Sequence, residues 1–307
     1  MRTSRRFPAA LLFVLLAAAP LAASAQSSAP TATSAVPSFS HIFVIVLENH
    51  EYGDVVGNPQ LPYLNDLATQ YGLATASYGV SHPSLPNYLA LTGGDTFGVT
   101  SDCTDCFVNS PNLVDQLETA GKSWKAYMDG MPSPCFLGNQ DQYAQKHNPF
   151  LYYDDVRTNP ARCAKIAPFT DFAGDLKATT VPDFAWITPD QCNDMHSCPA
   201  AQGDAWLKTW VPQILASPAW KDGGALFITF DEGTSDAGCC GSSGGGHIAT
   251  LVISPLGIPG TKSDTPVEHY GLLRTIEESW RMPYLGAAAT AAPLTGFFPT
   301  GVAPSAA

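Results

Sequence analysis

Two apolar segments of this chain each break off at acidic residues. Residues 41–47 run directly into Glu48, Asn49 and His50, and residues 225–230 run into Asp231 and Glu232. Continuous β-branched and aliphatic runs of this length are typical of strands buried on both faces of a parallel sheet. In such sheets, ligands bind beyond the carboxyl ends of the strands. The pattern therefore predicts an α/β fold with both polar groups at one edge of the sheet.

The rest of the chain alternates between helical and strand patterns. A helix is expected to begin at Leu85, and helical patterns also cover residues 63–72, 112–120, 201–215 and 269–280. Apolar strand patterns cover residues 124–127, 181–190 and 247–255. This alternation predicts one α/β domain over residues 40–285, with a mainly parallel sheet sandwiched by helices.

The two ends of the chain differ in composition from this domain. Residues 1–25 combine three arginines, an apolar run and the sequence Ala23-Ser24-Ala25, which predicts a signal peptide cleaved after Ala25. An uncleaved anchor is the alternative, but the apolar run is shorter than the roughly 20 residues of a membrane helix. We expect a flexible linker at residues 26–39 and a loosely ordered Ala/Pro-rich tail at 286–307. The protein is therefore expected to be secreted or periplasmic, with no transmembrane segment.

The chain contains eight cysteines. An even number in an exported protein indicates disulfides. A local bridge such as Cys192–Cys198 fits the spacing, although the full pairing stays open. A structural zinc site is the alternative, but only Cys103 and Cys106 have the Cys-x-x-Cys spacing that it requires.

The formal net charge of the chain is −12. A nucleic-acid binder needs a basic face for phosphates, so this acidity argues against a nucleic-acid partner. A site that handles phosphate in this chain must obtain its positive charge locally, from a metal ion or from histidines.

The two acidic groups at the predicted strand ends offer oxygen ligands. Carboxylate and amide oxygens suit a hard divalent cation, or zinc where histidine joins them. A single pair, such as Asp231 and Glu232, would be explained by a solvated loop. Two pairs that each end an apolar strand instead favour a metal site.

Ser84 lies in "VSHPSLPNYLALTGG", between Pro83 and Pro86. A serine hydroxyl becomes a nucleophile when a base or a metal activates it. At the start of a helix it would also lie near backbone N–H groups that suit a phosphate oxygen, and Asn87 could donate its amide to the same group. The alternative is that Ser84 only caps the helix.

Five of the histidines lie in loops or at the ends of predicted strands. Several histidines around one crevice suggest ligands, an acid or anion binders, whereas a single loop histidine is usually only solvated. These residues are His82, His147, His196, His247 and His269.

With these residues in view, the sequence resembles the bacterial secreted phosphoesterases, a family with an alkaline-phosphatase-like fold that includes acid phosphatases and phospholipases C. The likeness is carried by "VIVLENHEYGDVVGN", "HPSLPNYLALTGGDTFG", "YAQKHNPFLYYDDV", "NDMHSCPAAQGDAWL", "ITFDEG" and "HYGLLRTIEESWRMPYLG", in family order. The second and fourth of these resemble in particular the short acid phosphatases that include phosphoinositide 3-phosphatases.

This resemblance implies roles by position. It implies that one divalent ion (Ca, Mg, Mn or Zn) is bound by Glu48, Asn49, Ser84, Asp231 and Glu232, although many relatives have two aspartates at the last two positions. It implies that Ser84 is the nucleophile and that Asn87 contacts phosphate. Two-metal members of the fold hold their second ion with an Asp/His cluster. Asp194, His196 and His269 occupy that region with a different spacing, so histidines are expected to replace the second metal.

The resemblance also implies a reaction. A phosphoserine would form on Ser84, with a protonated His196 or His147 assisting the leaving alcohol, which favours mildly acid pH. We expect Asn87, His82, Asp194, His247 and His269 to contact the substrate, a small phosphorylated molecule or a phospholipid headgroup. A phosphomonoesterase is favoured because the chain lacks the extra C-terminal modules of the larger phospholipases. A phospholipase C type phosphodiesterase and a non-catalytic binding protein are the alternatives, and the oligomeric state stays open.

Overall fold

A computed structural model of the protein describes residues 1, 35–178 and 180–299. The predicted signal peptide beyond Met1, residues 26–34 of the predicted linker and residues 300–307 of the predicted tail lie outside the described residues. The following description concerns the unit formed by residues 33–307.

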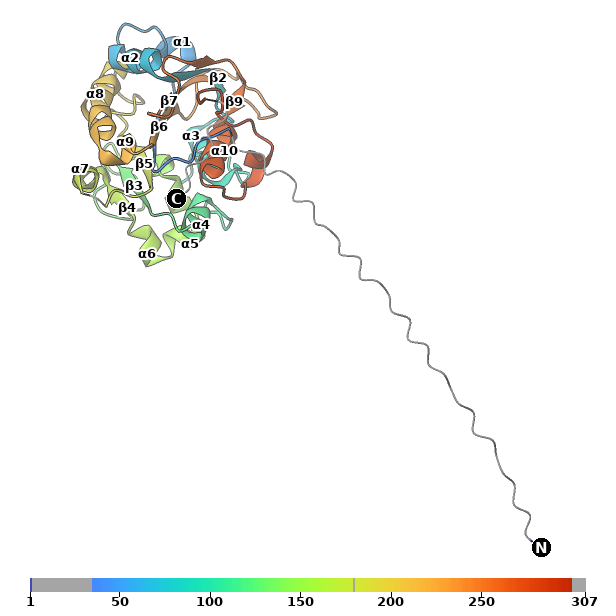
Figure 1. The fold of residues 1–307 in the computed structure, drawn as a ribbon. Coiled ribbons are helices and arrows are strands. Elements are labelled where there is room, and N and C mark those ends of the chain that lie inside the picture. Colours follow the sequence, from blue (N-terminus) through green and yellow to red (C-terminus); the bar gives the residue numbers. More distant parts are fainter. Residues whose placement is uncertain (2–34, 179, 300–307) are drawn as a thin grey trace. The chain divides into compact units, whose positions relative to one another are not determined.

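A mixed sheet forms the centre of this unit (Figure 1), and its strands follow the order β4-β3-β5-β1-β6-β7-β2-β8 in the described part of the chain, with β9 also paired to β2. β1 (Ile42–Leu47) lies between β5 (Phe184–Thr188) and β6 (Ala225–Phe230), parallel to both. β3 (Trp124–Met128) and β4 (Ile166–Pro168) continue this parallel arrangement. β7 (His247–Ile253) is antiparallel to β6 and to β2 (Gly72–Tyr78), and the short strands β8 (Lys262–Ser263) and β9 (Val267–Glu268) run parallel to β2.

The register of these strands brings chemically active side chains to one edge. Leu47 pairs with Phe230, so the residues that follow β1 and β6 emerge side by side. Because β7 runs in the opposite direction, its first residue, His247, lies at the same edge and pairs with Tyr78. Tyr78 also pairs with Glu268, which places the start of the following helix there as well.

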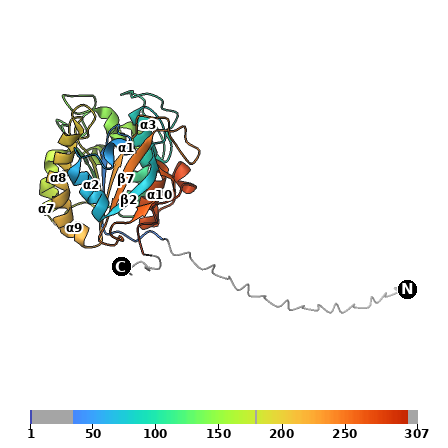
Figure 2. The same ribbon diagram turned by 90° about the horizontal axis from the view of Figure 1, so that it is seen from above.

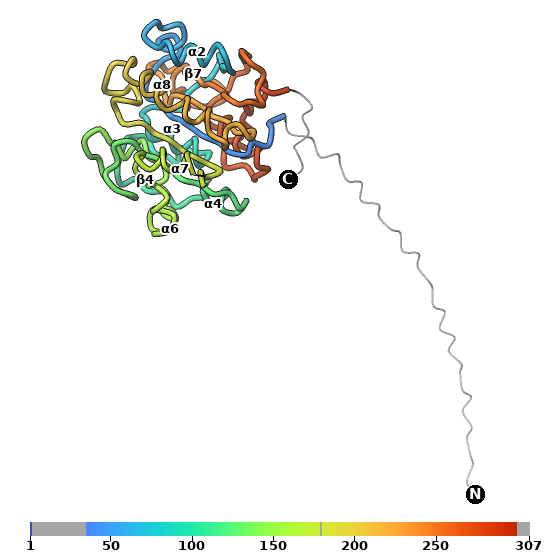
Figure 3. The backbone as a smooth tube through the Cα atoms, turned by 60° about the vertical axis from the view of Figure 1, so that its left-hand side comes forward, coloured from blue at the N-terminus to red at the C-terminus, as the bar shows by residue number. Residues whose placement is uncertain are grey.

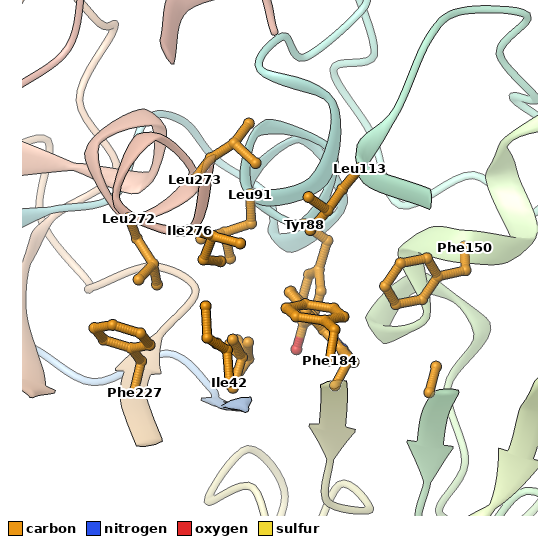
Figure 4. Packing of buried hydrophobic residues seen from close by; sticks show 14 of the residues in the cluster. Ile42, Tyr88, Leu91, Leu113, Phe150, Phe184, Phe227, Leu272, Leu273 and Ile276 are labelled. Atoms are coloured by element: carbon orange, nitrogen blue, oxygen red, sulfur yellow. The ribbon is translucent and has the colours of Figure 1, made fainter. Parts of the chain in front are cut away.

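Helices cover both faces of the sheet (Figure 2). Alternate residues of β1 point to opposite faces, as the strand period of two requires. One face packs against α3 (Ser84–Gly93), α4 (Leu113–Thr119) and α10 (His269–Ser279), and Figure 4 shows Ile42, Leu91 and Ile276 in this layer. The other face packs against α2 (Pro62–Gln70), α7 (Phe172–Lys177), α8 (Ala200–Ala216) and α9 (Pro218–Lys221). Figure 3 shows α2 and β7 side by side although they are far apart in the sequence.

Short helices and turns connect these elements. They are α1 (Tyr52–Val55), α5 (Asp154–Arg157), α6 (Pro160–Cys163) and the 3₁₀ turns η1 (Gln145–His147), η2 (Pro149–Tyr152), η3 (Phe169–Asp171) and η4 (Gly286–Ala289). Within residues 35–178 and 180–299, none of the helices is both long and apolar enough to cross a bilayer.

The predicted α/β class with a mainly parallel sheet is confirmed. The sequence patterns did not reveal β2, whose composition of Gly, Ala, Thr and Ser is weakly apolar, or the short strands β4, β8 and β9. They also gave no sign that β7 is antiparallel, because strand direction depends on the connections between strands and leaves the buried residues equally apolar.

Both ends of the described unit are packed more firmly than their composition suggests. In the predicted linker, Phe39 is buried, and its carbonyl oxygen accepts a hydrogen bond from Trp280 Nε1 at 2.8 Å. In the predicted loose tail, Leu294, Phe297 and Phe298 are buried, and the rings of Phe39 and Phe298 lie 5.4 Å apart. The prediction of a loosely ordered tail is therefore wrong as far as residue 299. A few aromatic side chains anchor the segment, and burying each of them contributes about 1.5–3 kcal/mol.

All eight cysteines form disulfides, namely Cys103–Cys106, Cys135–Cys163, Cys192–Cys198 and Cys239–Cys240. The expected bridge between Cys192 and Cys198 is confirmed. The alternative of a zinc site at Cys103 and Cys106 is excluded because their sulfur atoms are bonded to each other.

Glu277 of α10 predicts a pH dependence of stability. Its buried carboxylate accepts hydrogen bonds from Gln116 Nε2 at 3.0 Å and Leu285 N at 2.8 Å, and burial raises its pKa to about 7. The folded state therefore holds a proton that the unfolded chain loses near pH 4.5. Glu277 then destabilises the fold increasingly as the pH rises from 4.5 to 7. We expect Glu277→Gln to raise the free energy of unfolding at pH 8 by about 2 kcal/mol, and by clearly less at pH 5, in urea titrations. An equal effect at both pH values would contradict this assignment.

Candidate active site

The residues that follow β1 and β6 meet at the carboxyl edge of the sheet. Glu48 and Asp231 are fully buried, and Glu232 is 6% exposed. The backbone N–H of Asn49 donates to Asp231 Oδ1 at 3.1 Å, and the N–H of Asp231 donates to the Leu47 carbonyl oxygen at 2.9 Å. The fold thus brings the two polar groups of the sequence into direct contact.

Ser84 joins this group as the first residue of α3. Its side chain is buried, and its hydroxyl lies 3.2 Å from Glu48 Oε2 and 3.4 Å from Glu232 Oε1. The residue that caps α3 is Pro83, so the alternative in which Ser84 only caps the helix is wrong. A hydroxyl held between two carboxylates has acceptors for its proton, which is what an activated nucleophile needs.

Asn87, one turn into α3, holds the loop that precedes Ser84. Its Oδ1 accepts from the N–H groups of Val80 at 2.9 Å and Ser81 at 3.1 Å, and its Nδ2 donates to the carbonyl oxygens of Ser81 at 2.8 Å and Pro83 at 3.3 Å. These four bonds use the whole hydrogen-bonding capacity of a buried amide. The geometry therefore shows Asn87 holding the loop, and its expected phosphate contact stays a prediction.

A glycine-rich loop supports the same segment from the other side. Gly79 N donates to Gly246 O and Gly245 N donates to Gly79 O, each at 3.0 Å. A Cβ atom on Gly79 would lie 2.5 Å from the carbonyl oxygen of Gly245, so only glycine permits this close approach.

The donor set of this site fits a divalent cation. Asn49 Oδ1 and Asp231 Oδ2 are buried and have no hydrogen-bond partner among the described residues. Burial and the neighbouring charges of Asp231 and Asp194 raise the pKa of Glu48 well above its usual range, and burial raises the pKa of Asp231 to about 6. Buried oxygen donors that repel one another and lack partners are what a hard cation stabilises.

Behind Glu48 lies a second layer of buried polar side chains. His147 Nε2 is 3.2 Å from Glu48 Oε2, and His147 Nδ1 is 3.3 Å from Asp194 Oδ2. Glu48, His147 and Asp194 each offer a ligand atom within 4.8 Å of the others, so this group could also hold a cation. The ring of His147 is stacked on Tyr88, whose hydroxyl donates to Glu48 Oε1.

This burial bears on the expected role of His147. Its side chain is 3% exposed, and burial lowers its pKa well below the usual range. Both ring nitrogens lie close to carboxylates, although Nε2 has no hydrogen-bond partner among the described residues. A buried ring is better placed to orient Glu48 than to reach a leaving group, and the acid role of His147 and the substrate contact of Asp194 stay predictions.

His82 and His196 lie at the entrance of the site. His82 Nδ1 is 2.6 Å from Glu232 Oε2, and its Nε2 donates to the Ser235 carbonyl oxygen at 3.0 Å. Although burial alone would lower it, the hydrogen bonds to Ser235 and Glu232 raise the pKa of His82. The exposed ring of His196 lies 5.8 Å from that of His147, and its Nδ1 is 3.0 Å from Ser197 Oγ.

His247 and His269 have packing roles. The ring of His247 is stacked on Tyr52 at 4.5 Å and on Tyr78 at 5.1 Å, and its Nε2 donates to the Thr75 carbonyl oxygen. His269 is buried, and its Nε2 donates to the carbonyl oxygen of Asp231. The geometry therefore places both residues as supports of the strand ends, and their expected substrate contacts stay predictions.

Three further residues at this edge were not singled out from the sequence. Tyr88 contacts Glu48. It lies four residues after Ser84 on α3, so helical spacing could have indicated that both side chains lie on the same face of the helix. Lys146 forms an ion pair with Asp102, which in turn accepts the N–H of Leu85. No local pattern indicates that contact, because it joins two separate loops.

The sequence of this chain is similar to one known family and to proteins whose activities are named. The profile of the Phosphoesterase family matches residues 57–283. The chain is 33% identical to an acid phosphatase of Aspergillus fumigatus over 86% of its own length and 60% of that protein. It is 33% identical to a phosphatidylinositol-3-phosphatase of Mycobacterium tuberculosis over 93% of both chains.

Other similarities are partial or distant. Phospholipase C A of Mycobacterium tuberculosis is 32% identical over 39% of this chain and 23% of that protein. Among solved structures, a protein of the alkaline phosphatase superfamily from Vibrio parahaemolyticus matches 81% of this chain and 68% of its own, with a TM-score of 0.53 and 16% identity. That likeness shows a shared fold. The chain spans about 60% of the length of the Aspergillus relative.

Proposed function

The chain belongs to the phosphoesterase family, and from this premise we propose that it is a metal-dependent phosphomonoesterase with Ser84 as its nucleophile. The observation that carries the proposal is the position of the Ser84 hydroxyl between Glu48 and Glu232, beside the unpartnered oxygens of Asn49 and Asp231. The names of the Aspergillus and Mycobacterium relatives support a phosphatase activity.

One divalent ion is proposed as the cofactor, held by Glu48, Asn49, Ser84, Asp231 and Glu232. When bound, such an ion lowers the pKa of the serine hydroxyl and neutralises charge on the phosphoryl group. The oxygen donors suit Mg²⁺, Ca²⁺, Mn²⁺ or Zn²⁺.

In the proposed reaction, Ser84 is the nucleophile and His196 is the acid and base. Ser84 Oγ passes its proton to a neighbouring carboxylate, Glu48 or Glu232, and attacks phosphorus, forming a P–Oγ bond while the bond to the alcohol oxygen breaks. His196, exposed at the entrance, donates a proton to the departing alkoxide. A water molecule then attacks phosphorus, His196 takes its proton, and the P–Oγ bond breaks as the same carboxylate returns its proton to Ser84. Positioning and charge neutralisation carry most of the catalysis.

The role of His196 favours acid conditions. Burial lowers the pKa of His196 below its usual 6.5. The first step needs the protonated ring, and the protonated fraction grows as the pH falls through this pKa. The proposed enzyme therefore works best at mildly acid pH, in agreement with the name of the Aspergillus relative.

The proposed substrates are phosphate monoesters, with phosphoinositides as candidates because of the name of the Mycobacterium phosphatase. The alternative is a phospholipase C type phosphodiesterase, which the partial match to Phospholipase C A favours. Export to an oxidising compartment is also proposed, and the four disulfides of the described residues support it.

Steady-state kinetics with p-nitrophenyl phosphate and p-nitrophenyl phosphorylcholine test this proposal. We expect a kcat/KM at least about 10-fold higher for the monoester, loss of activity after exhaustive chelation, and recovery on adding back single divalent ions. A higher kcat/KM for the diester would contradict the proposed function and favour the phospholipase C type phosphodiesterase. Activity that survives chelation would contradict the proposed metal dependence. If the protein hydrolyses neither substrate, a non-catalytic binding protein is favoured.

A further inference from the structure

We propose that Lys146 binds a non-bridging oxygen of the phosphoryl group and thereby makes the site selective for monoesters over diesters. This inference rests on the proposed function and adds a specificity-determining residue to it. The expected partner of Lys146 is the second negative charge of a phosphate monoester.

Lys146 is fixed beside the nucleophile by one bridging carboxylate. Its Nζ lies 2.9 Å from Asp102 Oδ2, and Asp102 Oδ1 accepts the backbone N–H of Leu85 at 3.0 Å. Leu85 directly follows Ser84, so Asp102 ties the ammonium group to the first turn of α3. The Lys146 side chain is 19% exposed, which leaves it accessible to a ligand while restricting its motion.

The charge of Lys146 acts on the carboxylates of the site. It partly offsets the burial that raises the pKa of Glu48 and of Asp194. In return, Glu48 and Asp231 help to raise the pKa of Lys146. Lys146 also precedes His147, whose ring touches Glu48. The ion pair with Asp102, the bond from Asp102 to Leu85 and the position next to His147 place the ammonium group close to the carboxylates that surround Ser84.

The composition of the site creates a need for this charge. Glu48, Asp194, Asp231 and Glu232 are all acidic, so one divalent cation leaves little positive charge for an anionic substrate. An ammonium group has three N–H donors, and the contact with Asp102 uses one of them. The others are available to a phosphate oxygen, for which lysine acts as a point charge.

This charge distinguishes two substrate classes. A monoester carries three non-bridging oxygens and up to two negative charges, whereas a diester carries two such oxygens and one charge. A lysine that pairs with the additional charged oxygen stabilises the monoester more than the diester. Its removal should therefore lower the selectivity as well as the rate.

The test compares wild type with Lys146→Met on p-nitrophenyl phosphate and p-nitrophenyl phosphorylcholine. Because the variant loses a charged hydrogen bond to the substrate, we expect kcat/KM to fall about 10- to 100-fold for the monoester and by less than about 5-fold for the diester. The inhibition constant of inorganic phosphate should rise about 10-fold or more. Lys146→Arg should keep most of the selectivity, because it keeps the charge and the ion pair. Lys221→Met, at an exposed position on α9, is the matched control and should change neither substrate's rate.

Asp102→Asn tests the positioning role separately. The amide oxygen can still accept the Leu85 N–H, but the ion pair with Lys146 is lost. We expect kcat/KM for the monoester to fall by about 5- to 10-fold, which is less than in Lys146→Met, and kcat/KM for the diester to fall by a smaller factor. An equal fall for both substrates would mean that Asp102 supports only the helix.

Two results would overturn the inference. One is an unchanged ratio of monoester to diester activity in Lys146→Met, and the other is an unchanged phosphate inhibition constant. If wild type turns over neither ester, the proposed function fails instead. Calorimetric titration of wild type and Lys146→Met with inorganic phosphate then decides the role of Lys146 directly, since equal affinities would refute it. Lys146→Gln, which also removes the charge, serves this purpose where the methionine variant does not fold.

Discussion

Replacing Ser84 with alanine should lower kcat for p-nitrophenyl phosphate by about 10⁴-fold or more. The hydroxyl is the group that would form the bond to phosphorus, and no other step can replace it once it is absent. The change removes one oxygen from a buried position and leaves the Asn87 contacts with the loop in place. Stopped assays at mildly acid pH, with the metal content measured in each sample, separate loss of chemistry from loss of metal.

The matched control is Ser81→Ala in the same loop. The Ser81 hydroxyl donates to the carbonyl oxygen of His82, away from Glu48. We expect its kcat to stay within about 3-fold of wild type, as surface substitutions away from a site usually do. If Ser84→Ala keeps wild-type activity, Ser84 is not the nucleophile.

Asp231→Asn should have the second-largest effect, with opposite signs on activity and on stability. Removing one charged ligand should abolish stoichiometric metal binding and lower kcat/KM by about 10³-fold. In the metal-free protein the same change should be stabilising. Because burial raises the pKa of Asp231 from 3.8 to about 6, its ionisation lowers the stability increasingly as the pH rises from 3.8 to 6, and a neutral amide removes this cost. We expect the free energy of unfolding of the metal-free protein to rise by about 2 kcal/mol at pH 7.5.

Thermal denaturation with and without divalent ions measures both effects. Ligand binding to the folded state raises the Tm of wild type, and this rise should disappear in Asp231→Asn. Asp129→Asn is the matched control, since Asp129 follows β3 and accepts hydrogen bonds from Asn193 and Trp206. A metal-dependent rise of Tm that survives in Asp231→Asn would show that the ion binds elsewhere.

The strand ends that carry the site could be predicted because their signals are local. The apolar runs before Glu48 and Asp231 are long and end sharply, and parallel strands bring such ends together. The Ser84 segment was equally visible from its flanking prolines. The resemblance of whole blocks then joined these pieces into one site.

Contacts between distant loops could not be predicted in this way. His147 reaches Glu48 across a separation of 99 residues and becomes a buried support, whereas its place in a polar loop suggested an exposed acid. The same reason hid Lys146 and Asp102. The packing of the C-terminal segment could not be predicted from its composition either. Phe297 and Phe298 anchor this segment by their burial, but two aromatic residues hardly change the composition of an Ala/Pro-rich stretch.

The stereochemical course at phosphorus tests the central claim most directly. A substrate with an isotopically chiral phosphoryl group is hydrolysed, and the configuration of the phosphate transferred to an acceptor alcohol is determined. Attack by Ser84 followed by attack of the acceptor inverts phosphorus twice, so the account predicts overall retention. Overall inversion would mean direct transfer in a single step, and it would contradict a phosphoserine on Ser84.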